Sequence, residues 1–290
     1  MKFLKIKDWP TNLKGVVVVG GIFILSRLLL AGLGVSFNLE YLEKGWQFID
    51  PALLKNQLWS SLWYLHSQPP LFNLFSGLVL QLFPVHFSLV FHWFFVMAGL
   101  ALTVFLFLIM RKLKINWWLA VVITLLFVLS PTIILFENFF FYDYLVLVIL
   151  LISVFFLQQY LEKNKSGYLF TFFLILSLLT LLRSLFHLVW FLVIFLVLLY
   201  FYRRNWKKVI LASLIPFLLI IGWYGKNLYL FGNFGASSWM GMGLYKTTMF
   251  LTTEAERQTL FKEGITSGYF PMDPFTINLA NIKIQKVMVI

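Results

Sequence analysis

Asp50 is the acidic residue whose surroundings best suit a catalytic acid or base. It lies directly before Pro51 and precedes a stretch, 51–65, in which apolar residues recur at spacings of three and four. That spacing predicts an amphipathic helix at a membrane surface. A carboxylate held there could accept a proton as a general base. A structural role is also open, because an Asp followed by Pro commonly caps a helix.

Glu137 and Asp143 form a second acidic element. They flank the uncharged residues 138–142, most of which are aromatic. Acids in so apolar a segment need partners, water or a functional role. Alternatively, they mark the places where helices leave a bilayer. The acids lack the regular spacing of metal ligands, and we predict neither a metal nor a cofactor.

Arg27 and Arg183 lie within or beside apolar stretches. A charge in such a place is costly and often marks an anionic partner. A guanidinium group can hold phosphate with two hydrogen bonds, so both arginines are predicted to bind a phosphate. Arg183 could instead extend its side chain to the membrane surface. His66 precedes Ser67-Gln68-Pro69-Pro70 and is ambiguous as a lone histidine. His187 shares a helical face with Arg183 if one helix runs through both, and a structural role is also open for it.

Composition identifies the class of protein in which these residues lie. Hydrophobic residues make up 61% of the 290 residues. Charged residues make up 12%, against roughly 25% in soluble domains. The net charge of +12 is spread between apolar runs rather than gathered in a patch, which argues against nucleic-acid binding. The chain has no cysteine and no Gly-rich phosphate loop, which excludes disulfides, thiolate metal sites and a dinucleotide fold.

Apolar segments suited to crossing a bilayer recur along the chain. Every second break between them carries a cluster of lysine and arginine: 1–15, 111–116, 161–166 and 203–208. Because positively charged loops stay in the cytoplasm, the N-terminus is predicted to be cytoplasmic and most acids to lie outside. The predicted fold is an all-α transmembrane bundle in the cell membrane, with about seven spans: 16–36, 86–110, 117–136, 139–160, 168–182, 185–202 and 209–225.

The first predicted outer loop, 37–85, is large and contains interfacial helices. Its second apolar stretch, 71–83, is bounded by Pro70 and Pro84 and is too short for a span. Treating it as a span would also move the later positive clusters to the outside. Residues 1–226 are therefore predicted to form the transmembrane domain. Residues 227–290 are expected to be non-cytoplasmic and to begin a C-terminal half that is truncated in this chain.

The order of these elements resembles the GT-C superfamily of polytopic glycosyltransferases, which includes protein O-mannosyltransferases and aminoarabinose transferases. The resemblance covers most of the chain and rests on short motifs. These are Asp50, His66-Ser67-Gln68-Pro69-Pro70-Leu71, residues 137–143, Arg183 and the segment 226–244.

The resemblance implies a membrane enzyme that moves a sugar from a polyprenyl-phosphate-linked donor. The acceptor would be a lipid, glycan or protein that enters from the non-cytoplasmic side. The implied site residues are Asp50 as catalytic acid or base and, for binding the donor and acceptor, Glu137, Asp143, Arg27, Arg183 and His66.

Two other classes of function remain open. A transporter or flippase for an anionic lipid or solute could use the same arginines, although the sequence shows no internal repeat. An acyltransferase could use His187 as its catalytic base. Release of free polyprenyl phosphate from a lipid-linked sugar would distinguish the glycosyltransferase from the transporter.

The position of the segment 71–83 can be tested with cysteines, since the chain has none of its own. If the segment stays outside, Ser67→Cys should react with an impermeant thiol reagent added to intact cells. Asn116→Cys should react only after the membrane is permeabilised. Labelling of Asn116→Cys in intact cells would mean that the segment crosses, and that Glu137 and Asp143 lie on the side opposite Asp50.

Overall fold

The computed structural model describes residues 9–45, 47–249 and 251–266. Of these residues, 78% are helical and none belongs to a strand. The chain divides after Ala236 into two compact units. The described helices of the second unit are α13 (Trp239–Met249) and α14 (Glu254–Lys262). Of the predicted non-cytoplasmic segment 227–290, residues 267–290 lie outside the described residues.

The first unit contains the apolar helices and the helices of the first loop. The apolar helices are α1 (Trp9–Gly32), α6 (Phe87–Lys112), α7 (Trp117–Val128), α8 (Pro131–Glu137), α9 (Tyr142–Lys163), α10 (Ser166–Leu182), α11 (Leu188–Phe201) and α12 (Trp206–Phe231). The loop helices are α2 (Glu40–Lys44), α3 (Pro51–Asn56), α4 (Leu58–Trp63) and α5 (Leu71–Leu82).

In the part of the chain that the structure describes, four helices are long and apolar enough to cross a membrane: α1, α6, α9 and α12. A fifth span is possible if α7 and α8 act together, although they are bent by 58°. The bend falls before Pro131, which begins α8 and cannot continue the hydrogen bonding of α7. With 17 and 14 residues, α10 and α11 are shorter than a typical span. The all-α fold is therefore confirmed, and the count of seven spans stays a prediction.

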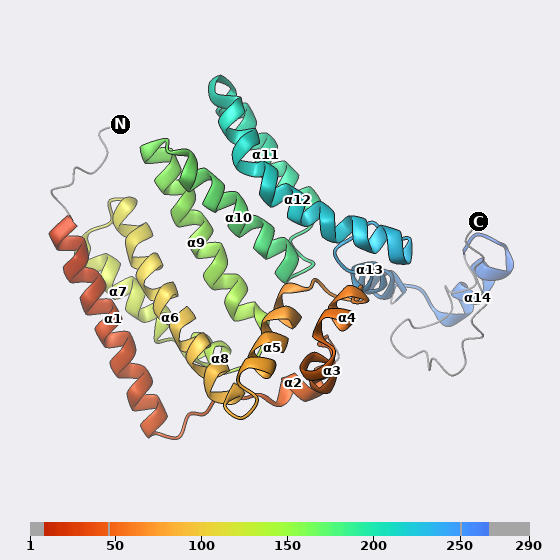
Figure 1. The fold of residues 1–290 in the computed structure, drawn as a ribbon, viewed down its shortest axis with the longest axis horizontal. Coiled ribbons are helices and arrows are strands. Elements are labelled where there is room, and N and C mark those ends of the chain that lie inside the picture. Colours follow the sequence, from red (N-terminus) through yellow and green to blue (C-terminus); the bar gives the residue numbers. More distant parts are fainter. Residues whose placement is uncertain (1–8, 46, 250, 267–290) are drawn as a thin grey trace. The chain divides into compact units, whose positions relative to one another are not determined.

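The long helices pack in series. α1 contacts α6, α6 contacts α9, α9 contacts α10, and α10 contacts α12, as the ribbon in Figure 1 shows. α7 packs against both α1 and α6, and α11 packs against α12. The core where α6 and α9 meet is strongly aromatic, with Phe91, Phe95, Phe140 and Tyr144 all less than 2% exposed.

The first loop differs from the prediction in one respect. The single amphipathic helix expected over 51–65 is two short helices, α3 and α4, which break at Gln57. The side chain of Gln81 in α5 donates to the carbonyl oxygens of Leu54 and Lys55, at 3.3 and 3.1 Å. These carbonyls would otherwise accept from the next helical turn, so the contact with α5 favours the break. α5 itself has 12 residues, which corresponds to about 18 Å of helix.

A short parallel bridge joins the first loop to the segment that follows α8. The backbone N–H of Asn38 donates to the backbone carbonyl of Asn138 at 2.7 Å, and the backbone N–H of Phe140 donates to the backbone carbonyl of Asn38 at 3.0 Å. The bridge holds the start of the first loop beside the predicted acidic element 137–143.

Gly99 marks a close approach of α6 to its neighbours. A Cβ atom there would lie 2.5 Å from Oε2 of Glu137, 2.6 Å from the hydroxyl of Tyr144 and 2.7 Å from Cζ of Phe23. These atoms belong to α8, α9 and α1, so the missing side chain lets three helices meet over α6.

Gly99→Ala is expected to destabilise the protein by about 1–3 kcal/mol, because the added methyl group overpacks a filled site. Gly222→Ala in α12 is the matched control, since nothing lies within 4 Å of its Cβ position. The control should be neutral or stabilising by up to about 1 kcal/mol, as expected for Gly-to-Ala in a helix. Thermal unfolding in detergent measures both variants, and equal melting temperatures would contradict the packing described.

Candidate functional site

Asp50 caps helix α3 and remains exposed. Its Oδ1 atom accepts from the amide of Ala52 at 2.7 Å, and Pro51 occupies the first helical position. Its Oδ2 atom makes no hydrogen bond within the described part of the chain. The structural role left open by the sequence is therefore real, and it leaves one carboxylate oxygen available to a ligand.

Two buried contacts fix the backbone that carries Asp50. The amide of Ile49 donates to Oδ1 of Asn73 at 2.9 Å, and Asn73 in α5 is 2% exposed. The hydroxyl of Tyr142, at the start of α9, donates to Oε1 of Gln47 at 2.7 Å. The segment before Asp50 is thus held by α5 on one side and by α9 on the other.

Asp143 and Arg183 form an ion pair beside Tyr142. Asp143 lies in the first turn of α9, where the helix dipole favours a negative charge. Arg183 follows the last residue of α10, and its guanidinium lies 5.4 Å from the centre of the Tyr142 ring. The two side chains are 30% and 32% exposed. Among the described residues, the guanidinium has no other hydrogen-bonding partner, so some of its N–H groups remain free.

These residues form what we call the loop site. Tyr142 contacts both halves, since it bonds to the segment before Asp50 and lies under Arg183. The members of the loop site are Gln47, Asp50, Asn73, Tyr142, Asp143 and Arg183.

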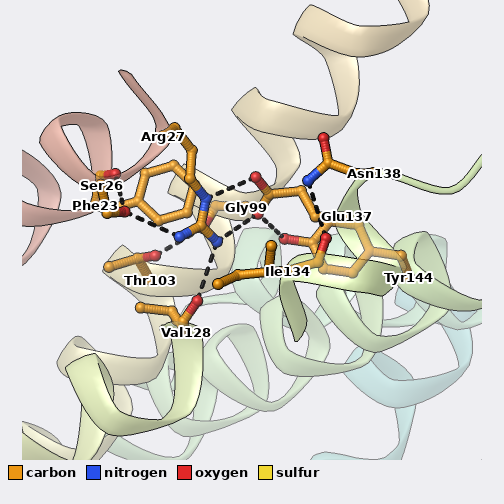
Figure 2. Close-up of polar contacts among 10 residues, drawn as sticks. All are labelled: Phe23, Ser26, Arg27, Gly99, Thr103, Val128, Ile134, Glu137, Asn138 and Tyr144. Carbon is orange, nitrogen blue, oxygen red and sulfur yellow. Dashed lines mark hydrogen bonds and ion pairs between the residues drawn. The ribbon is translucent and has the colours of Figure 1, made fainter. Parts of the chain in front are cut away.

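Arg27 and Glu137 form a separate, buried pair (Figure 2). Nε of Arg27 donates to Oε1 of Glu137, and Nη2 donates to Oε2, both at 2.8 Å. Arg27 is 9% exposed and Glu137 is 1% exposed. The geometry is the two-pronged arrangement in which guanidinium and carboxylate interact most strongly.

The remaining polar atoms of this pair are also occupied. Nη2 of Arg27 donates to the carbonyl of Val128 at 3.0 Å, and Nη1 donates to the hydroxyl of Ser26. The hydroxyl of Tyr144 donates to Oε2 of Glu137 at 2.9 Å. Val128 ends α7, so its carbonyl has no helical partner because the helix breaks before Pro131. The network therefore joins α1, α7, α8 and α9, and the hydrogen-bonding groups of the pair are taken up by protein partners.

The two acids that the sequence placed together thus have different partners. Glu137 faces Arg27 of α1, whereas Asp143 faces Arg183 of α10. Similarly, all three guanidinium nitrogens of Arg27 donate to protein oxygens. Arg183 is paired with Asp143 and stays partly exposed. Only the pair at Asp143 belongs to the loop site.

His66 lies in a third place, against the end of α12. Its ring centre is 4.5 Å from that of Phe231. Burial, and secondly the charge of Lys226, lower the pKa of His66 below its ordinary value. His66 is consequently neutral at pH 7 and able both to donate and to accept a hydrogen bond.

Lys226 is a residue of this region that the sequence analysis assigned no role. α12 continues past the predicted end of its span, so Lys226 lies within the helix. Its Nζ atom donates to the carbonyl of Leu65 at 2.5 Å and lies 3.6 Å from the centre of the Trp223 ring. The signal in the sequence that could have pointed to Lys226 was its place at the end of the last apolar stretch. Asn73, the polar residue within the apolar stretch 71–83, was the corresponding signal for the loop site.

His187 serves as a helix cap. Its Nδ1 atom accepts from the amide of Val189 at 3.3 Å, at the start of α11. α10 ends at Leu182 and α11 begins at Leu188, so no single helix carries Arg183 and His187. The shared helical face considered from the sequence is therefore wrong. Within the described residues, no three His, Asp or Glu side chains lie close enough together to hold a metal ion.

Arg27→Gln should cost about 3–5 kcal/mol of stability, because it leaves the buried carboxylate of Glu137 without its counter-charge. Arg183→Gln, at the half-exposed pair, should cost about 1 kcal/mol or less. The double variant Arg27→Met, Glu137→Leu should recover much of the loss, since it removes both buried charges. Melting temperatures in detergent measure all three, and equal losses for the two single variants would contradict the distinction between the pairs.

Comparisons of the chain with protein-family models, with curated proteins and with solved structures found no match. The features of the loop site are an exposed carboxylate, a half-exposed carboxylate–guanidinium pair, and a tyrosine that lies beside this pair and bonds to the segment before the exposed carboxylate.

Proposed function

We propose that this chain is a multi-pass membrane glycosyltransferase. It would move a sugar from a polyprenyl-phosphate-linked donor to an acceptor at the non-cytoplasmic face. The observation that carries the proposal is the loop site. There, Tyr142 links the segment before the exposed Asp50 to the half-exposed pair of Asp143 and Arg183.

The proposal includes a cytoplasmic N-terminus and about seven spans in the cell membrane. The four long apolar helices support a multi-pass protein. α10 and α11 would cross as short spans, which a bilayer accommodates by local thinning at a modest cost. The alternation of positive and neutral breaks along the sequence supports this orientation.

The three charged members of the loop site have roles in the proposed reaction. Asp50 accepts the proton of the acceptor hydroxyl as that oxygen forms a bond to the anomeric carbon of the sugar. The bond between that carbon and the phosphate oxygen breaks, and the lipid phosphate leaves with the electron pair. The free N–H groups of Arg183 stabilise the charge on the leaving phosphate. Asp143 orients Arg183 and is available to sugar hydroxyls.

The structure favours Arg183 over Arg27 for the phosphate. All three nitrogen atoms of the Arg27 guanidinium already donate to protein oxygens. Withdrawing them would leave Glu137 buried and unpaired, at a cost of several kcal/mol. Arg183 needs no such rearrangement. His66, a neutral residue of the first loop, is retained as a binding residue for the acceptor or donor.

A transporter for an anionic lipid is the second candidate, and the bent pair α7–α8 is the observation in its favour. Broken helices near a charged residue are typical of transporter binding sites, and Glu137 ends α8. However, the charge at this break is neutralised by Arg27 and both side chains are buried. Purified protein that releases free polyprenyl phosphate from a lipid-linked sugar would identify an enzyme, whereas movement of the intact lipid between leaflets would identify a flippase.

Asp50→Asn should reduce sugar transfer by about 10²–10⁴-fold, the usual contribution of a general acid or base. The fold should be retained, because Asn caps a helix as well as Asp does. Transfer is measured as polyprenyl phosphate released by purified protein. Glu43→Gln is the matched control, an exposed acid in the same loop, and should keep wild-type activity. Near-normal turnover in a folded Asp50→Asn variant would remove Asp50 from the catalytic role.

A further inference from the structure

Two neighbouring cavities lie between α1 and α6, and none of their lining residues belongs to the loop site. The first, a crevice of about 270 Å³, follows the flanks of the two helices. The second, of about 460 Å³, lies where α1 ends and α6 begins. Val35 and His92 line both, which places the two cavities next to one another.

The crevice suits a hydrocarbon chain. Its walls include Leu28 of α1 together with Trp93 and Met97 of α6, and these side chains are 61%, 55% and 58% exposed. Both helices are long and apolar enough to span a membrane. The charged residues that line the crevice, Arg27 and Glu137, neutralise one another. The crevice therefore offers apolar surface with no net charge.

The second cavity suits a polar headgroup. Ser36, His86, Ser88 and His92 line it, and no carboxylate does. In the described part of the chain, none of these four side chains makes a hydrogen bond. Hydroxyl and imidazole groups can all donate to phosphate oxygens. At the ends of two spanning helices, this cavity would lie at the depth of lipid headgroups.

We propose that α1 and α6 bind one phosphate-headed lipid of the surrounding bilayer. Its hydrocarbon chain occupies the crevice, and its phosphate occupies the second cavity beside His86 and His92. The inference goes beyond the proposed transfer reaction and shares with it only the placement of α1 and α6 across the bilayer.

The arrangement of the two cavities identifies the occupant as a lipid. A water-soluble anion would fill the second cavity and leave the exposed apolar crevice empty. A purely apolar molecule would make no use of the four hydrogen-bonding side chains that line the second cavity. A phosphate-headed lipid meets both requirements, because its chain and its headgroup are joined in the same order as the cavities.

The test uses the full chain in nanodiscs of phosphatidylcholine with a phosphatidylglycerol probe that carries a photoreactive acyl chain. Crosslinked peptides identified by mass spectrometry should come from α1 and α6. Unlabelled phosphatidylglycerol should compete about tenfold better than diacylglycerol, which corresponds to about 1.4 kcal/mol for the phosphate. Inorganic phosphate at the same concentration should not compete, since it lacks the chain. Equal competition by diacylglycerol, or crosslinks only to other helices, would overturn the proposal.

Variants separate the crevice from the headgroup cavity. Met97→Trp fills the crevice and should reduce crosslinking several-fold, whereas Leu211→Trp in α12, 69% exposed and lining neither cavity, should not. His92→Phe keeps the aromatic contact with Phe37 and removes the imidazole nitrogens. It should abolish the preference for phosphatidylglycerol over diacylglycerol. Unchanged crosslinking in Met97→Trp, or an unchanged preference in His92→Phe, would contradict the assignment.

A further variant distinguishes this inference from the proposed enzyme. Asp50→Asn should crosslink like the wild type, because Asp50 lines neither cavity. Lipid binding by a wild-type protein that shows no transfer activity would support the site and reject the proposed function. Loss of crosslinking in a folded Asp50→Asn variant would instead show that the probe binds at the loop site, and would overturn the separate site.

Discussion

The buried ion pair between Arg27 and Glu137 is the interaction on which the rest of the first unit depends. Neither charge is tolerable alone in so apolar a core, and the two-pronged contact neutralises both. The same guanidinium satisfies the carbonyl that is left free where α7 breaks before Pro131. Tyr144 completes the carboxylate, and Gly99 makes room for the whole group over α6. One network thus ties four helices to a fifth.

This network also positions the candidate site. Glu137 ends α8, so its pairing with α1 sets where the following residues emerge. Those residues bridge to Asn38 at the start of the first loop and then lead into Tyr142 and Asp143. The loop site therefore rests on the buried pair without sharing its charges. One carboxylate–guanidinium pair is buried and its groups are taken up by protein partners, whereas the other is partly exposed, and only the second enters the proposed reaction.

Arg27 and Glu137 also line the crevice between α1 and α6, and because they neutralise one another the crevice carries no net charge. Had either charge been unpaired, the crevice would favour an ion over a hydrocarbon chain. The buried pair thus affects both sites. It positions the elements of the loop site, and it leaves the proposed lipid site without net charge. The groups proposed to bind phosphate differ accordingly: a partly exposed arginine in the loop site, and histidine and serine side chains between α1 and α6.

Much of the fold was predictable from the sequence, because hydropathy and charge act locally along the chain. The long apolar runs, the short stretch 71–83 and the cap at Asp50 each depend on residues close together in sequence. The break at Gln57 was not predictable, since it depends on a side chain in a different helix, Gln81.

The pairing of the charges could only be decided by the tertiary structure. From the sequence, Arg27 and Arg183 had the same predicted role, and so did Glu137 and Asp143. Arg27 meets a partner 110 residues away, whereas Arg183 meets an acid on an adjacent helix and stays half-exposed. The sequence by itself determined an all-α protein with several apolar helices and a short set of candidate residues. Which of these residues are free to act was decided by packing, because burial and partners depend on contacts between distant segments.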